Sequence, residues 1–183
     1  MNRRDDRNGK FQRRTWIAAA MVGGLSATLQ AASKAEDPEQ EAKLAKLPQG
    51  VPLVSSDFSA YEVKQGVKWA KVQPVAVEGM PFRQALRIDT TAAPKEDANL
   101  RIQTLSIAPL KHQDAVLITF YARAVAPPKG EKTADLNIKF CWAVPPWAGS
   151  VNRTFSLDGQ WRKYYVSFPA VVKDKSKPKP ARF

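Results

Sequence analysis

Two tryptophans flank a stiff, proline-containing segment in the second half of the chain. Trp142 and Trp147 lie on either side of Pro145 and Pro146, and prolines restrict the conformations open to such a loop. An exposed Trp147 would be held ready to stack on the flat face of a ligand with little ordering cost. The alternative for Trp147 is packing within its own loop. Trp142 ends an alternating strand on its apolar side, so a place in the core is favoured over a ligand contact.

Planar polar side chains that could accompany an aromatic platform occur on other expected strands. Arg101 and Gln103 alternate with apolar residues in segment 100–107, so they share one strand face, which carries either a ligand or only solvent. Tyr121 points away from its neighbour Phe120 and is a candidate to line the same cleft. Aromatic rings combined with guanidinium and amide groups suit non-covalent binding of a ligand.

Residue types that carry catalysis are sparse. His112 is the only histidine, which excludes an HExxH zinc site, and no segment resembles a nucleophile elbow. Two carboxylates suffice for a glycosidase, but the Asp and Glu residues here flank turns, as solvated side chains do. We therefore expect no enzymatic activity, no cofactor and no metal site. A structural calcium ion is common in β-sandwiches, but no Asp-rich loop indicates one.

The net charge of +12 is concentrated at the ends of the chain. Residues 1–35 carry a surplus of five positive charges, 173–183 a surplus of four, and 36–172 a surplus of only three. Because nucleic-acid binding needs a basic face on the folded part, we expect no nucleic-acid partner. The single cysteine, Cys141, allows no disulfide within the chain and is expected in the core.

The N-terminal 35 residues have the organisation of an export signal. A basic stretch ends at Arg13-Arg14, an apolar segment spans 16–29, and small residues precede a cleavage site after Ala35, with Ala31 as a weaker option. The run 13–17 (RRTWI) resembles a twin-arginine signal, although adjacent arginines also occur in Sec signals. The apolar segment is too short to be a stable membrane anchor. A secreted or periplasmic protein follows, and the alternative is a short anchoring or buried helix.

The remaining chain divides by composition into a linker, a folded domain and a tail. Residues 36–50 are charged and lack large aromatics, which is typical of a linker. Residues 173–183 alternate Lys with Pro and Ser, which predicts neither strand nor helix. The domain 51–172 has period-two alternation, with strands expected over 84–89, 100–107, 115–122, 135–142 and a final strand ending at Phe168. We expect an all-β antiparallel β-sandwich of the jelly-roll type.

The alternation also assigns faces and one turn. Val116, Ile118 and Phe120 share a face of their strand, as do Leu136, Ile138, Phe140 and Trp142 of the next. Between 155 and 161, an Asp-Gly pair separates two apolar-rich segments. Such a pair predicts a tight hairpin, because glycine accepts the positive φ of primed turns.

Four segments in this order resemble the galactose-binding-like jelly-roll domains of CenC-type (family 4/9-like) carbohydrate-binding modules. They are 81–88 (PFRQALRI), 108–114 (APLKHQD), 118–124 (ITFYARA) and 159–168 (GQWRKYYVSF). The resemblance spans roughly 120 residues. Members of this family usually have a glycine in the turn where Gln113 stands here, and they continue beyond the last strand with one or two more. The chain therefore resembles a truncated module, or the N-terminal remnant of a longer enzyme.

The resemblance implies a secreted, monomeric, non-catalytic module that docks plant-type or other polysaccharide on a concave sheet face. The candidate sugar contacts are then Trp147, Tyr121, Arg101 and Gln103, and Trp142 is a less favoured fifth. The resemblance assigns a structural role to Trp161. Two alternatives remain open. The domain could be an ancillary sandwich that only spaces a neighbouring enzyme domain, or a fragment of a xylanase-type glycoside hydrolase that lacks its catalytic domain.

Overall fold

The computed structural model describes residues 38–90, 100–127, 130–143 and 149–171, together with the backbone of two further strands. Most of this chain is β-structure, and every strand pair is antiparallel. The predicted all-β antiparallel class is thereby confirmed. The strands are β1 (Arg14–Ala20), β2 (Glu62–Gln65), β3 (Ala70–Ala76), β4 (Gln84–Thr90), β5 (Arg101–Gln103), β6 (Ala115–Ala126), β7 (Ala134–Trp142), β8 (Gly149–Leu157), β9 (Arg162–Pro169) and β10 (Ala181–Arg182).

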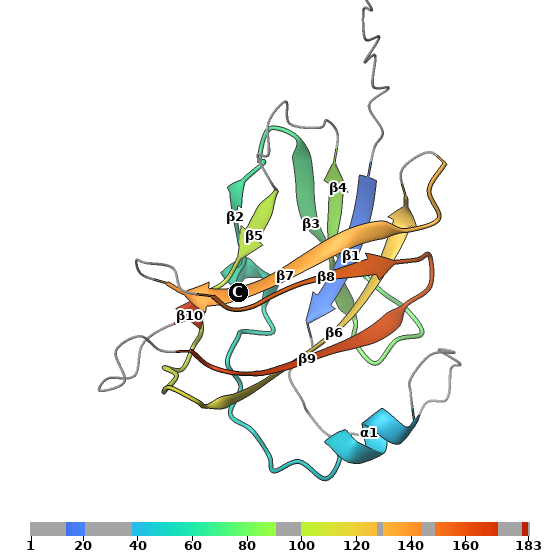
Figure 1. Ribbon diagram of the computed structural model, residues 1–183. Helices are drawn as coiled ribbons and strands as arrows, with labels where there is room; N and C mark the ends of the chain where they lie inside the picture. Colours follow the sequence, from blue (N-terminus) through green and yellow to red (C-terminus); the bar gives the residue numbers. More distant parts are fainter. Residues whose placement is uncertain are drawn as a thin grey trace, which may run out of the picture.

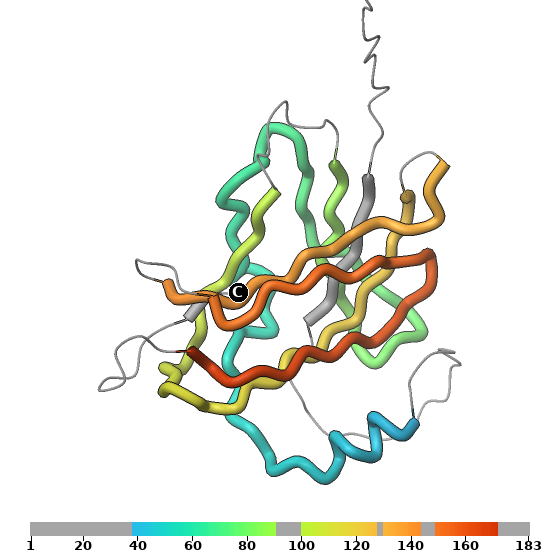
Figure 2. The backbone as a smooth tube through the Cα atoms, in the orientation of Figure 1, coloured from blue at the N-terminus to red at the C-terminus, as the bar shows by residue number. Residues whose placement is uncertain are grey.

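The strands form a five-stranded sheet in the order β3-β4-β1-β6-β9, a three-stranded sheet in the order β10-β7-β8 and the pair β2-β5. In Figure 1, β7 and β8 cross in front of the five-stranded sheet. The tube in Figure 2 shows the same crossing and places α1 (Pro38–Leu44) next to the β6 and β9 end of the molecule. A short 3₁₀ helix, η1 (Phe58–Ala60), follows α1.

A hydrophobic core fills the space between the β6–β9 half of the large sheet and the β7–β8 pair. Val116, Phe120 and Ala122 of β6 are buried in it. So are Phe140 of β7 and Val166 of β9, with Ile118, Leu136 and Ile138 packed against them. The alternation therefore assigned the inner faces of both strands correctly, because successive side chains of a strand point to opposite sides.

The segment around Asp158 and Gly159 is not the tight hairpin that the Asp-Gly pair predicts. β8 pairs with β7 and β9 pairs with β6, so the chain crosses from one sheet to the other between Leu157 and Arg162. Gly159 does not have a positive φ. Instead, the carbonyl of Asp158 accepts a hydrogen bond from the Ala124 amide at 2.7 Å, which ties the crossing to β6. The Asp-Gly pair favours a hairpin locally, but β8 and β9 instead pair with different strands, because both bury their apolar faces in the common core.

Helix α1 lies within the segment predicted to be a linker. Proline at its first position and acidic residues in its first turn favour a helix start, because they suit the unpaired amides and the helix dipole there. Lys43 forms an ion pair with Glu39 at 2.6 Å, one turn earlier. None of its residues is buried.

Both ends of the chain contribute a strand. β1, from the segment that resembles an export signal, pairs with β4 on one side and β6 on the other. β10, from the Lys/Pro-rich tail, pairs with β7 at Trp142 and Cys141, although the composition of the tail predicts no strand. Among the described residues, no helix has the length and apolar character needed to span a membrane.

Candidate binding face on β6 and β9

The predicted contact residues do not come together in one place. Trp147 lies outside the described residues. Trp142 is only 7% exposed, and its indole N–H donates a hydrogen bond to the Val171 carbonyl at 2.5 Å. Its ring is thus a structural element of β7, as the alternation favoured. Cys141, predicted in the core, is half-buried and points away from the core residue Phe140.

Arg101 and Gln103 lie on β5, in the small sheet with β2. Arg101 is exposed, whereas Gln103 is only 5% exposed. The Gln103 side-chain carbonyl has no hydrogen-bond partner within the described part of the chain. The two side chains therefore do not form the shared solvent-facing strip that their spacing predicts.

Tyr121 faces away from the core residue Phe120, as predicted, but it is only 3% exposed. It belongs to a second buried cluster with Phe82 and Ala85, on the outer face of the five-stranded sheet. Burial prevents its ring from acting as an open platform. Its role is to support the side chains that surround it.

The outer face of β6 and β9 brings together six side chains that we call the aromatic–cation cluster. In the β6–β9 ladder, Tyr121 lies opposite Lys163, and Thr119 lies opposite Tyr165. Arg123, two residues along β6 and on the same face, reaches Trp161 at the start of β9. The members are Phe82, Tyr121, Arg123, Trp161, Lys163 and Tyr165.

Three aromatic rings form the centre of this cluster. Phe82 packs against Tyr121 with ring centroids 5.2 Å apart and meets Trp161 edge-on at the same distance. Such tilted and edge-to-face contacts contribute beyond the area they bury. Phe82 is contributed by the β3–β4 connection, which is closed by a hydrogen bond from the Val77 amide to the Arg83 carbonyl.

Two cations lie against these rings. The Arg123 guanidinium is 5.1 Å from the Trp161 ring centroid. The Lys163 ammonium is 5.8 Å from the Tyr121 centroid and 5.4 Å from that of Tyr165. Each separation is within the range of cation–π attraction. Lys163 also forms an ion pair with Glu41 of α1 at 2.6 Å, and the two side chains are 17% and 33% exposed.

Two polar groups of the cluster are buried without a hydrogen-bond partner among the described residues. They are the Nε of Arg123 and the hydroxyl of Tyr165. Buried donors are normally paired, because leaving one unpaired costs about 1–3 kcal/mol. Two such groups on one sheet face therefore lack a partner, although almost no surface of either atom is exposed.

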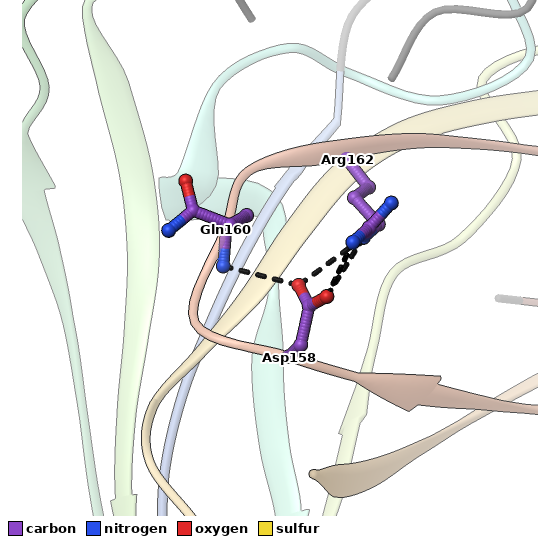
Figure 3. A network of polar contacts seen from close by, with 3 residues as sticks. All are labelled: Asp158, Gln160 and Arg162. Atoms are coloured by element: carbon purple, nitrogen blue, oxygen red, sulfur yellow. Dashed lines mark hydrogen bonds and ion pairs between the residues drawn. The ribbon is translucent and has the colours of Figure 1, made fainter. Parts of the chain in front are cut away.

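The turn that delivers β9 is held by a charged network, drawn in Figure 3. The Asp158 carboxylate accepts hydrogen bonds from the backbone N–H of Gln160 at 3.1 Å and from Arg162, whose Nη2 lies 2.5 Å away. Hydrogen bonding by Arg162 is the main cause of a lowered pKa for Asp158, and the same bond raises the pKa of Arg162. This network fixes the entry of β9, directly next to Trp161.

The outer face of β7 and β8 offers a contrast. Its cross-strand pairs are polar, with the Asn137 amide donating to the Thr154 hydroxyl at 3.0 Å and the Ser156 hydroxyl donating to Asp135 at 2.8 Å. Lys139 is exposed on the same face. These polar groups satisfy one another, so this face is an ordinary solvated surface.

Sequence reasoning missed Arg123, Lys163 and Tyr165. Their signal was present in the alternation of β9, where Lys163, Tyr165 and Ser167 oppose the inward Tyr164, Val166 and Phe168. What was missing was the pairing of β9 with β6, which joins residues 40 to 54 positions apart in the sequence.

Within the described residues, no group of three His, Cys, Asp or Glu side chains could hold a metal ion. In comparisons with known proteins, no protein-family model, no curated protein and no solved structure matches the chain.

Proposed function

We propose that the chain is an exported, non-catalytic carbohydrate-binding module with a jelly-roll β-sandwich fold. Its binding face is formed by the partly exposed members of the aromatic–cation cluster, which are Arg123, Trp161, Lys163 and Tyr165. The observation that carries the proposal is the gathering of aromatic rings, two cations and two unpaired polar groups on one face of the β6–β9 pair. Sugar rings present C–H faces and hydroxyl groups together, and this combination of side chains can engage both.

The likeness of four ordered segments to CenC-type modules supports the same proposal. Segment 118–124 lies on β6 and segment 159–168 leads into and along β9. Two of the four similar segments therefore supply the face proposed for binding. Export by the N-terminal signal and a monomeric state belong to the same proposal.

The second candidate is a spacer that packs against a neighbouring enzyme domain. The burial of Gln103 and Tyr121 favours it, because two of the predicted sugar contacts are inaccessible. A spacer would not retain a glycan.

Retention on insoluble xylan and on cellulose distinguishes these candidates. We expect the full chain to sediment with at least one glycan, and Trp161→Ala to lose most of that retention. Asn137→Ala, on the polar face of β7, is the matched control and should behave as the unaltered protein. Circular dichroism establishes that each variant is folded. Absence of retention by the folded protein on both glycans would favour the spacer.

A further inference from the structure

Glu41 and Lys163 are far apart in the sequence and form an ion pair in the structure. The pair joins α1 to β9 at 2.6 Å across 122 residues. The helix has no buried residue, and this ion pair joins it to the sheet. A carboxylate on a helix without buried residues can be exchanged for another carboxylate.

The surroundings of Lys163 strengthen its preference for an anion. Its side chain is 17% exposed and lies between the rings of Tyr121 and Tyr165. An ion pair with reduced access to water is screened less than one in bulk solvent, so its attraction is larger. The ring faces hold the ammonium in place without neutralising it.

Two further donors lie on the same face. Arg123, two residues from Tyr121 along β6, has a buried Nε without a partner, and Tyr165 has a buried hydroxyl without one, within the described residues. Glu41 accepts a hydrogen bond from Lys163 and, within the described residues, from neither of these two donors. The face therefore offers one cation already engaged by a carboxylate and additional donors still unfilled.

We propose, resting on the proposed function, that the ligand is an acidic polysaccharide and that Lys163 binds the carboxylate of a uronic acid residue in the place now taken by Glu41. Arg123 and Tyr165 donate to further oxygens of the same ligand. Helix α1 is thus an internal competitor, which a neutral glycan cannot displace. The positive surplus that remains beyond residue 35, three charges in 36–172 and four in 173–183, favours approach of such a polyanion.

The test compares polygalacturonate with its fully methyl-esterified form, using the full chain at fixed ionic strength. The two probes have the same sugar backbone, and only the first has carboxylates. We expect binding to polygalacturonate and much weaker binding to the ester. Lys163→Met should weaken polygalacturonate binding about tenfold. Glu41→Gln should tighten it roughly two- to fivefold, because the competitor is removed.

Lys139→Met is the matched control, since it removes the same charge from the exposed face of β7. Equal weakening by Lys163→Met and Lys139→Met would overturn the inference, because it would show attraction to net charge alone. So would an unchanged or reduced affinity in Glu41→Gln. Equal binding of dextran sulfate or single-stranded DNA in every variant would likewise assign binding to the basic ends of the chain.

The same data separate this inference from the proposed function. Binding of the methyl ester or of xylan, unaffected by Lys163→Met, would leave a carbohydrate-binding module with a neutral ligand. Absence of binding to any of these glycans by the folded protein would remove both proposals.

Discussion

Lys163 lies directly opposite Tyr121 in the β6–β9 ladder, with its ammonium 5.8 Å from the centroid of the buried ring. The buried Tyr121 ring therefore supports the Lys163 ammonium and does not itself contact a ligand. Lys163, and not the predicted Tyr121, is the candidate binding residue of this pair. It also links the cluster to α1, through the ion pair of Lys163 with Glu41.

Phe82 is expected to be the residue on which the cluster depends most. Phe82→Ala removes a nearly buried ring that touches both Tyr121 and Trp161. The loss of packing and the cavity left behind should lower the free energy of unfolding by about 3 kcal/mol. Urea denaturation followed by tryptophan fluorescence measures this. Phe58→Ala, at a half-buried ring that contacts Tyr61, is the control and should cost clearly less; equal costs would contradict the role given to Phe82.

The Asp158–Arg162 pair should make stability depend on pH in acid. The pKa of Asp158 is lowered in the folded protein, mainly by the hydrogen bond from Arg162. Its contribution is therefore fully present above the unfolded-state pKa of about 3.9 and is lost as pH falls through the lower folded-state value. Because the pair is partly exposed, Asp158→Asn should cost at most about 1 kcal/mol at pH 7.

Thermal unfolding of Asp158→Asn and the unaltered protein between pH 7 and pH 2 tests this dependence. The two melting temperatures should differ at neutral pH and converge at the acid end. A constant difference across the whole range would show that the carboxylate charge is not the cause.

Gln113 occupies a position that favours glycine. Its φ is 70°, the one positive value at a non-glycine position among the described residues. Glycine adopts this conformation without strain, so Gln113→Gly should stabilise the protein by up to about 1 kcal/mol. Its amide would still donate to the Ala170 carbonyl at 2.8 Å. Differential scanning calorimetry measures the change, and Lys111→Gly, where φ is not positive, should instead destabilise.

Strand β1 should protect both of its neighbours. Ile17 pairs with Arg87 of β4 and with Arg123 of β6. Ile17→Pro removes an amide from the middle of a strand with partners on both sides, where proline is not accommodated. We expect faster hydrogen exchange of backbone amides in β4 and β6 of the full chain. Ile17→Val keeps the amide and should leave exchange unchanged; unaltered exchange in Ile17→Pro would contradict the central place of β1.

Removal of residues 1–35 by processing has a related consequence. It would take away β1, which separates β4 from β6 in the five-stranded sheet. A chain that begins at Glu36 should therefore show altered exchange in the same two strands. Protection identical to that of the full chain would mean that the sheet closes without β1.

The sequence by itself determined which residues of β6 and β7 face inward. Val116 and Phe120 of β6, and Phe140 of β7, were predicted correctly because the alternation of side chains is a property of consecutive residues. This alternation is a local feature that a few neighbouring residues decide. The positive φ of Gln113, by contrast, was not predicted.

Only the tertiary structure decided which strands became partners. The Asp-Gly pair predicted that β8 and β9 form a hairpin, yet they belong to different sheets because each buries its apolar face in the common core against another strand. That choice places Lys163 between Tyr121 and Tyr165 and within reach of Glu41. Spacing along the chain carries no information on such contacts, because strand pairing is settled by the burial of whole faces and not by the residues of one turn.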